Sequence, residues 1–173
     1  TFHEKALSSP VKFLHIANLN PVKDQTTLLK AFKMIVDKIP AHLTIVGEGS
    51  AEQFVKRFAH SLNVEDKINF KHVMPYEDLV SHYHQADVLL HTSLSEGQSE
   101  VVTEAMSCGV LVCGTNVGLM YDQPTCCISV PVQEAELLAQ EALNIKPFRP
   151  HGEKVWFWAL PKIHRLYWMY LIT

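Results

Sequence analysis

The sequence has few cysteines, and none of them has the spacing of a metal or disulfide framework. Four cysteines occur among 173 residues, and none forms a CxxC pair. Cys126 and Cys127 are adjacent, so on a strand their side chains would point to opposite faces of the sheet. We therefore expect neither a zinc site nor a disulfide scaffold, and we interpret the cysteines as buried thiols of the reducing cytosol.

An excess of basic residues is also missing. Lys and Arg together number 15 against 18 Asp and Glu, which gives a formal net charge of −3. The lysines are scattered and form no basic face, which argues against a nucleic-acid partner with a long footprint. Small anionic ligands are compatible with this charge.

Long hydrophobic runs and an N-terminal signal peptide are absent. The longest apolar stretch, 155–172, is interrupted by Pro161, Lys162 and Arg165, so we expect no membrane span. The chain begins at Thr1 rather than methionine, which suggests a fragment of a longer protein. We expect a cytoplasmic location, with the inner membrane face as the alternative for the full-length protein.

The sequence does contain a regular alternation of short apolar runs and segments of helical period. Its apolar content of 47% is enough for one domain with a full hydrophobic core. The pattern predicts six strands, at 11–19, 42–49, 67–73, 87–93, 110–116 and 126–131. It predicts helices at 24–38, capped by Asp24, and at 52–62, 75–86, 99–108 and 133–145. This order is typical of an α/β, Rossmann-like parallel sheet with helices on both faces.

We divide the chain into a Rossmann-like domain, residues 1–145, and a linker with a C-terminal helix, residues 146–173. Apolar and aromatic side chains form a stripe on that helix, with Trp156, Trp158 and Trp168 nearby. A membrane-interface helix is one interpretation. We favour packing on this domain or on a missing N-terminal domain.

Ligands of open parallel sheets bind outside the carboxyl ends of the strands. Four segments should meet at that edge, namely 17–23, 47–50, 73–76 and 92–99. The sequence therefore predicts one ligand site built from these loops.

Phosphate binding is expected at two places on this edge. Lys23 precedes the first helix, where its ammonium and the free backbone amides could face one anion, with a solvated surface lysine as the alternative. Gln98, Ser99 and Glu100 begin the fourth helix, and their amides could bind a second phosphate oxygen. A plain helix start capped by Ser99 is the alternative there.

Two glutamates flank this helix start. Glu96 lies in the loop and Glu104 in the helix, so both can point to the cleft edge at different depths. Carboxylates accept hydrogen bonds from hydroxyl groups, and this pair could grip a ribose and a second sugar. Two glutamates eight residues apart also occur by chance.

Metal binding is not predicted. No Asp-x-Asp motif occurs, so the sequence offers no metal bridge for a diphosphate. His82 and His84 would diverge on a helix, which favours surface histidines over a metal pair.

The segment "QADVLLHTSLSEGQSEVVTEAMSCGVLVCGTNVG" resembles the E-x7-E region of the retaining family-four (group 1) glycosyltransferases, which have the two-domain GT-B fold. Upstream, "FLHIANLNPVKDQTTLLKAF" is similar to the first strand, phosphate lysine and first helix of that family. "LTIVGEGS" is similar to its "IVG-x-G" turn. The resemblance covers residues 11–144, which would be the C-terminal domain alone.

The resemblance implies a role for each motif residue. Glu104 would bind the ribose hydroxyls, and Glu96 the hydroxyls of the transferred sugar near the reacting carbon. Lys23 would neutralise the diphosphate leaving group, so Lys23 and Glu96 are the expected catalytic residues. The base would meet the backbone at 73–74. The other residues implied at the donor are Asn18, Gly47, Val73, Met74, Gly97, Gln98, Ser99, Glu100 and Val101.

The chain departs from the family pattern at the phosphates. Ala17 and Asn18 stand where the family usually has Gly-Arg, so one of two phosphate cations is missing. "EGQS" stands where the family has E-G-F-G, so Ser99 replaces a glycine and Glu100 adds a negative charge. His72 replaces another frequent glycine.

The function implied by the resemblance is metal-independent transfer of a sugar, with retention, from a UDP- or GDP-sugar to an acceptor hydroxyl, without a cofactor. The acceptor would be a glycan or lipid-linked glycan of polysaccharide or glycoconjugate biosynthesis. An N-terminal domain would hold most of the acceptor site, so we expect this fragment alone to be inactive. A degenerate sugar-nucleotide-binding module and a sugar-nucleotide epimerase of the same fold are the alternatives. A phospho-receiver domain is disfavoured, because 17–18 supplies no acidic residue.

Overall fold

Six short strands rich in Val, Ile and Leu form one parallel sheet in the computed structural model, which describes residues 7–122 and 127–145. The strands lie in the order β3-β2-β1-β4-β5-β6. All five pairs are parallel, so the carboxyl ends of the strands share one edge. The strand bounds are β1 Val11–Ile16, β2 Ala41–Val46, β3 Ile68–Lys71, β4 Val88–His91, β5 Leu111–Thr115 and β6 Cys127–Val130.

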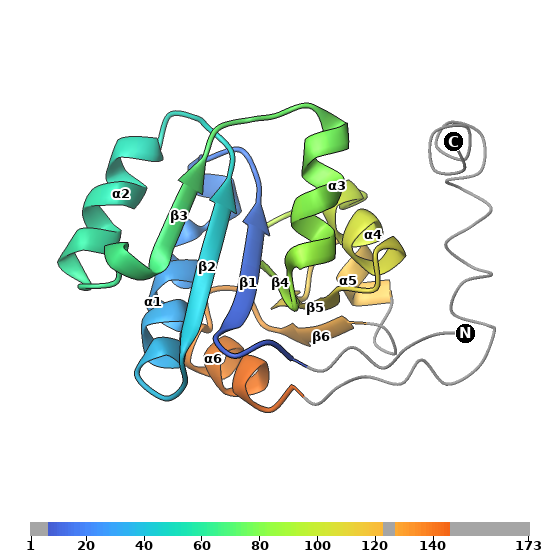
Figure 1. Ribbon diagram of the computed structural model, residues 1–173. Coiled ribbons are helices and arrows are strands. Elements are labelled where there is room, and N and C mark those ends of the chain that lie inside the picture. The colour runs from blue at the N-terminus through green and yellow to red at the C-terminus, as the bar shows by residue number, and fades with distance from the viewer. Residues whose placement is uncertain (1–6, 123–126, 146–173) are drawn as a thin grey trace.

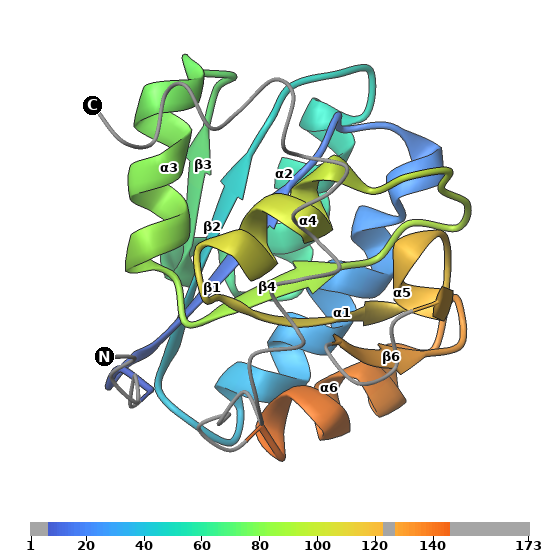
Figure 2. The same ribbon diagram turned by 90° about the vertical axis from the view of Figure 1, so that its right-hand side faces the viewer.

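Helices cover both faces of this sheet (Figures 1 and 2). Helices α1, α2 and α6 pack on one face, and α3, α4 and α5 pack on the other. The helix bounds are α1 Gln25–Val36, α2 Glu52–Ser61, α3 Tyr76–Gln85, α4 Glu100–Ser107, α5 Leu119–Asp122 and α6 Ala135–Leu143. The predicted Rossmann-like α/β fold is thereby confirmed for these residues.

Local chemistry explains where the elements that carry the site begin and end. Asp24 caps α1 by accepting a hydrogen bond from the Thr27 amide at 3.2 Å, as the sequence predicts. Pro75 stands at the start of α3, also as predicted. All four residues of β4 are buried, because helices cover both faces of this central strand.

The first strand is shorter than the sequence predicts. It ends at Ile16, and Asn20 then caps a 3-10 turn at Pro21–Lys23 by accepting from the amides of Val22 and Lys23. This turn separates Lys23 from the strand and places it directly before α1. The sequence prediction also omits α5, which has only four residues.

The strand order reverses between β1 and β4, since the chain adds strands on one side of β1 and then returns to the other side. Loops from opposite halves of the sheet diverge at such a switch point and leave a crevice at the carboxyl edge. None of the helices within residues 7–122 and 127–145 is long and apolar enough to cross a bilayer. The predicted linker and terminal helix, 146–173, lie outside the described residues.

Candidate functional site

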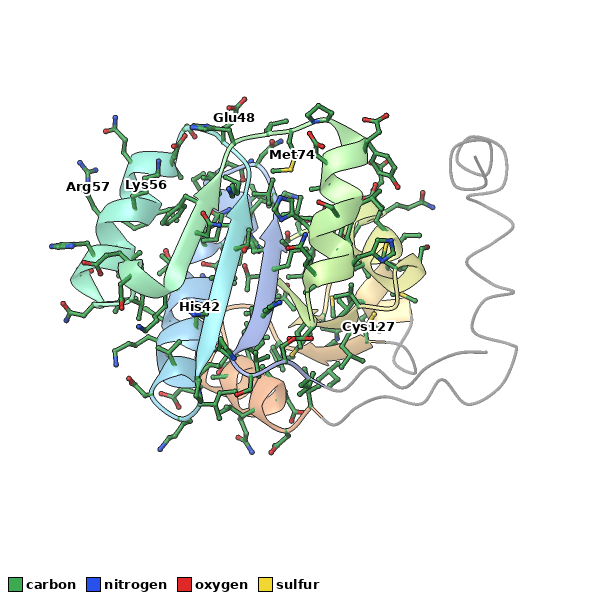
Figure 3. All side chains as sticks on the ribbon, in the orientation of Figure 1. His42, Glu48, Lys56, Arg57, Met74 and Cys127 are labelled. Atoms are coloured by element: carbon green, nitrogen blue, oxygen red, sulfur yellow. The ribbon has the colours of Figure 1, made fainter. Side chains whose placement is uncertain are left out.

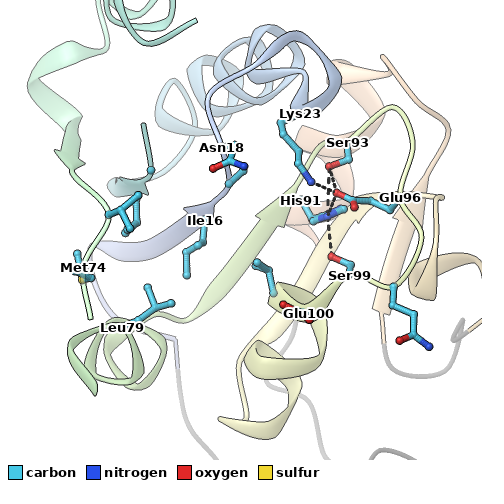
Figure 4. A pocket seen from close by; sticks show the side chains of 16 residues that line it. Ile16, Asn18, Lys23, Met74, Leu79, His91, Ser93, Glu96, Ser99 and Glu100 are labelled. Carbon is cyan, nitrogen blue, oxygen red and sulfur yellow. Dashed lines mark hydrogen bonds and ion pairs between the residues drawn. The ribbon is translucent and has the colours of Figure 1, made fainter. Parts of the chain in front are cut away.

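A cleft of about 340 Å³ opens at the switch point between β1 and β4 (Figure 4). Its walls come from the loops after β1, β2, β3 and β4 and from the first turns of α3 and α4, which is the edge that the sequence predicts. The lining residues are Ile16, Ala17, Asn18, Lys23, Val46, Gly47, Val73, Met74, Leu79, His91, Ser93, Glu96, Gln98, Ser99, Glu100 and Val101.

The cleft has an apolar end and a polar end. At the apolar end, Ile16, Val46 and Leu79 belong to the same apolar cluster as Met74. Met74 lies beside the start of α3 (Figure 3). The other end carries the charged and hydroxyl side chains (Figure 4). Such a cleft suits an elongated ligand with one flat or apolar group and one polar, anionic group.

Hydrogen bonds join the two loops that bear the predicted catalytic residues. The Leu94 amide donates to the Val22 carbonyl at 2.8 Å. The Thr92 hydroxyl donates to the Lys23 carbonyl at 2.9 Å. The loop after β1 is thereby fixed against the loop after β4, and Lys23 is held within reach of Glu96.

The Lys23 ammonium donates a hydrogen bond to Oε1 of Glu96 and forms an ion pair with it. The Ser93 hydroxyl donates to the same oxygen at 2.6 Å. Burial alone would raise the pKa of Glu96, but the hydrogen bonds from Lys23 and Ser93 bring it below its ordinary value. Glu96 is therefore an ionised carboxylate at neutral pH, with a side chain only 12% exposed.

His91 is a site residue that sequence reasoning missed. Its Nε2 lies 3.4 Å from Oε1 of Glu96 and 3.0 Å from Oγ of Ser99. Burial lowers the pKa of His91, and the positive charge of Lys23 lowers it further. The negative charge of Glu96 opposes this shift without reversing it. The available signal was a histidine ending an otherwise apolar strand, "DVLLH".

Ser99 stands at the N-cap position of α4, but its side chain does not cap the helix. Its hydroxyl bonds to His91 instead, which corrects the alternative of a plain helix start capped by Ser99. The Ser99 carbonyl accepts from the amides of Val102 and Thr103 at 3.1 and 3.2 Å. Glu100 and Val101, the first two helical residues, line the cleft.

Glu104 and Gly97 do not line the cleft, although the resemblance places both at the donor. Glu104 lies one turn beyond Glu100 on the same helix face, where its Oε2 accepts from the Tyr83 hydroxyl at 2.7 Å. Burial raises the pKa of Glu104, more than the Tyr83 hydrogen bond lowers it. The Glu104 carboxyl therefore bonds to α3 through Tyr83, whereas Glu96 bonds to Lys23 and Ser93.

The described side chains offer no ready metal site. Within residues 7–122 and 127–145, no group of three or more His, Cys, Asp or Glu side chains could hold a metal ion. The polar end of the cleft instead carries one ammonium, one imidazole, hydroxyls and the carboxylates of Glu96 and Glu100. These groups can donate hydrogen bonds to, and accept them from, an oxygen-rich organic ligand.

Comparison with known proteins agrees with this fold. The profile of the family described as "Glycosyl transferases group 1" matches residues 2–123. An uncharacterized glycosyltransferase of Haemophilus influenzae is 32% identical over 104 residues, covering 60% of this chain and 29% of that protein. A human GDP-Man:Man(3)GlcNAc(2)-PP-Dol alpha-1,2-mannosyltransferase is 23% identical over 128 residues, covering 67% of this chain and 26% of that protein.

A solved structure of S. aureus TarM, in a complex that contains UDP, superposes with a TM-score of 0.72 and 20% identity. The superposition covers 80% of this chain and 29% of TarM. The chain thus spans less than a third of the length of these relatives. Since the family profile covers more than half of the chain and the folds agree, the chain belongs to the group 1 glycosyltransferases.

Proposed function

We propose that the cleft binds a nucleotide diphosphate sugar, and that the protein containing this chain transfers the sugar to an acceptor hydroxyl with retention and without a metal. The observation that carries the proposal is the pairing of Lys23 with Glu96 at the polar end of a cleft whose other end is apolar. The base would occupy the apolar end, the diphosphate would lie near Lys23 and the start of α4, and the sugar near Glu96.

The chemistry follows from these positions. Breaking the bond between sugar and diphosphate builds negative charge on the leaving phosphate and positive charge on the sugar ring. The Lys23 ammonium and the first amides of α4 would stabilise the phosphate. The Glu96 carboxylate would stabilise the ring, and this end of the cleft is where both charges would develop.

The names of the relatives do not decide which nucleotide base the sugar donor carries. The human relative is named for a GDP-mannose donor, and TarM is seen with UDP. We therefore propose a UDP- or GDP-sugar, and an acceptor glycan or lipid-linked glycan held mainly by a separate N-terminal domain. The reaction would belong to polysaccharide or glycoconjugate biosynthesis in the cytoplasm.

A binding module without turnover is the second candidate, and Asn18 favours it. This residue lines the cleft where the family pattern has an arginine, so Lys23 is the only Lys or Arg side chain among the lining residues. A full-length protein that binds donor but releases no nucleoside diphosphate would support the module over the enzyme.

Thermal-shift measurements test donor binding directly. We expect UDP-glucose, UDP-N-acetylglucosamine or GDP-mannose to raise the unfolding midpoint in excess chelator, because a ligand that binds only the folded state stabilises it. The matching monosaccharides serve as controls and should leave the midpoint unchanged. If none of the nucleotide sugars raises the midpoint, the proposed function is wrong.

Replacing Glu104 with alanine tests the ribose end. If Glu104 binds the ribose hydroxyls, Glu104→Ala should weaken binding of the plain nucleoside diphosphate by about 1–3 kcal/mol, the cost of a lost charged hydrogen bond. Glu77→Ala, which removes an exposed glutamate from α3, is the matched control. Calorimetric affinities that agree for the two variants would remove Glu104 from the site.

A further inference from the structure

His91 is buried at the floor of the cleft, where the neighbouring strand leaves room for it. It is the last residue of β4, and its side chain is only 5% exposed. Gly114 lies beside it on β5. A Cβ atom at Gly114 would stand 2.1 Å from the His91 carbonyl oxygen and 2.8 Å from its Cβ, so β5 can approach His91 this closely only with a glycine there.

Two hydrogen-bond donors and the His91 ring meet at one oxygen of Glu96. Oε1 accepts from the Lys23 ammonium and the Ser93 hydroxyl, and Nε2 of His91 lies 3.4 Å from the same atom. Among the described residues, no hydrogen bond reaches Oε2 of Glu96. The carboxylate is thus held by one oxygen and keeps the other for a ligand.

The surroundings of the ring favour a proton on Nε2. An ionised carboxylate accepts hydrogen bonds and donates none, so Oε1 of Glu96 favours an N–H on the nitrogen that faces it. Nε2–H then donates to Oγ of Ser99 at 3.0 Å. Nδ1 is buried and has no partner within the part of the chain that the structure describes.

The contact with Ser99 has a consequence for α4. A serine at this position ordinarily turns its hydroxyl toward the amides of the first helical turn. Here the hydroxyl is held by His91, and no side chain caps the helix. Glu100 and Val101 line the cleft, so their amides, which have no side-chain cap, would be available to an anionic ligand.

We propose that His91 is a positioning residue for the reaction: its Nε2–H holds the hydroxyl of Ser99, and its ring packs 3.4 Å from Oε1 of Glu96. In this arrangement Oε2 of Glu96 and the first amides of α4 would face a sugar diphosphate. This inference rests on the proposed function. We assign His91 to positioning rather than to the reacting atoms, because its Nε2 faces Ser99 and Glu96 and its side chain is almost fully buried.

Substitutions at His91 separate positioning from simple packing. His91→Gln keeps an N–H donor near the Nε2 position, whereas His91→Leu keeps apolar volume and loses the donor. In the full-length protein, kcat for release of UDP or GDP from UDP-glucose, UDP-N-acetylglucosamine or GDP-mannose should fall about tenfold or more in His91→Leu. The glutamine variant should recover to within about threefold of wild type, with KM changing less than kcat in both.

Two kinetic results would overturn the inference. Wild-type kcat in His91→Leu would show that the donor N–H is not needed. An equal loss of kcat in His91→Leu and His91→Gln, at equal thermal midpoints, would show that only the shape of the imidazole matters. If the wild-type protein binds none of the three donors, the proposed function itself is wrong. A loss of kcat confined to the leucine variant is a different result, because it concerns His91 alone.

NMR of the unliganded chain tests the contacts independently of activity and of whether His91→Leu folds. Long-range 1H–15N spectra at neutral pH should show a neutral His91 ring with its proton on Nε2. Ser99→Ala should shift that Nε2 resonance and leave the ring of the exposed His60 unchanged. A proton on Nδ1, or a spectrum that Ser99→Ala does not alter, would contradict the proposal.

Discussion

Replacing Glu96 with glutamine should lower turnover of the full-length protein about tenfold or more while nucleoside diphosphate affinity stays within about twofold. The glutamine keeps the shape of the side chain and removes its charge. A plain nucleoside diphosphate lacks the sugar that Glu96 is proposed to contact, so its binding should change little. The positive charge that develops on the sugar ring would lose its stabilising carboxylate.

Kinetics and calorimetry on the same variant decide this prediction. Ser95→Ala is the control, because Ser95 is an exposed neighbour in the same loop and does not line the cleft. It should retain wild-type turnover and affinity. Near-normal turnover in Glu96→Gln would remove Glu96 from the reaction and reduce its ion pair with Lys23 to a structural contact.

Replacing Gly47 with alanine should destabilise the fold strongly. The φ angle of Gly47 is 149°, and an added Cβ would lie 1.9 Å from the backbone oxygen of Ala17. We expect the free energy of unfolding to fall by roughly 1–3 kcal/mol from the backbone strain. The steric contact should lower it by a further amount of roughly 1–3 kcal/mol. Both neighbours are fixed, since the Ala17 amide donates to Val46 and the Gly47 amide to Lys71.

Urea unfolding of the chain measures this loss, and Gly97→Ala is the matched control. A Cβ at Gly97 would have nothing within 4 Å, so its midpoint should stay near that of wild type. Equal midpoints for the two variants would contradict the packing that brings the loops after β1 and β2 together. The resemblance implies that Gly47 lies at the donor, and the close approach of Ala17 adds a reason within the fold for a glycine there.

The fold could be predicted from the sequence because its strands are short, largely apolar runs that alternate with segments of helical period. Strand order was not needed to place Lys23 and Glu96, since both follow strands whose carboxyl ends must share an edge. The short helix Leu119–Asp122 was missed because four residues give too little periodicity to detect.

The contacts within the site could not be predicted. The pairing of Lys23 with Glu96 depends on a backbone hydrogen bond between Leu94 and Val22, which no sequence pattern reports. The direction of the Ser99 hydroxyl depends on His91, which in the sequence is only the end of an apolar strand. Local rules predict caps and periods, whereas Lys23 and Glu96 come from loops far apart in the chain. His91 and Ser99 are close in the sequence, but only the folded loop between β4 and α4 turns their side chains toward each other.

Calorimetric titration of UDP and of GDP into the chain, in excess chelator, is the decisive measurement for a nucleotide site in this cleft. We expect at least one of them to bind with a stoichiometry of about one, and Lys23→Ala to weaken this binding, because the ammonium would neutralise the diphosphate. Binding of neither nucleotide, or binding that begins only when magnesium or manganese is added, would contradict a metal-independent nucleotide-sugar site in this cleft.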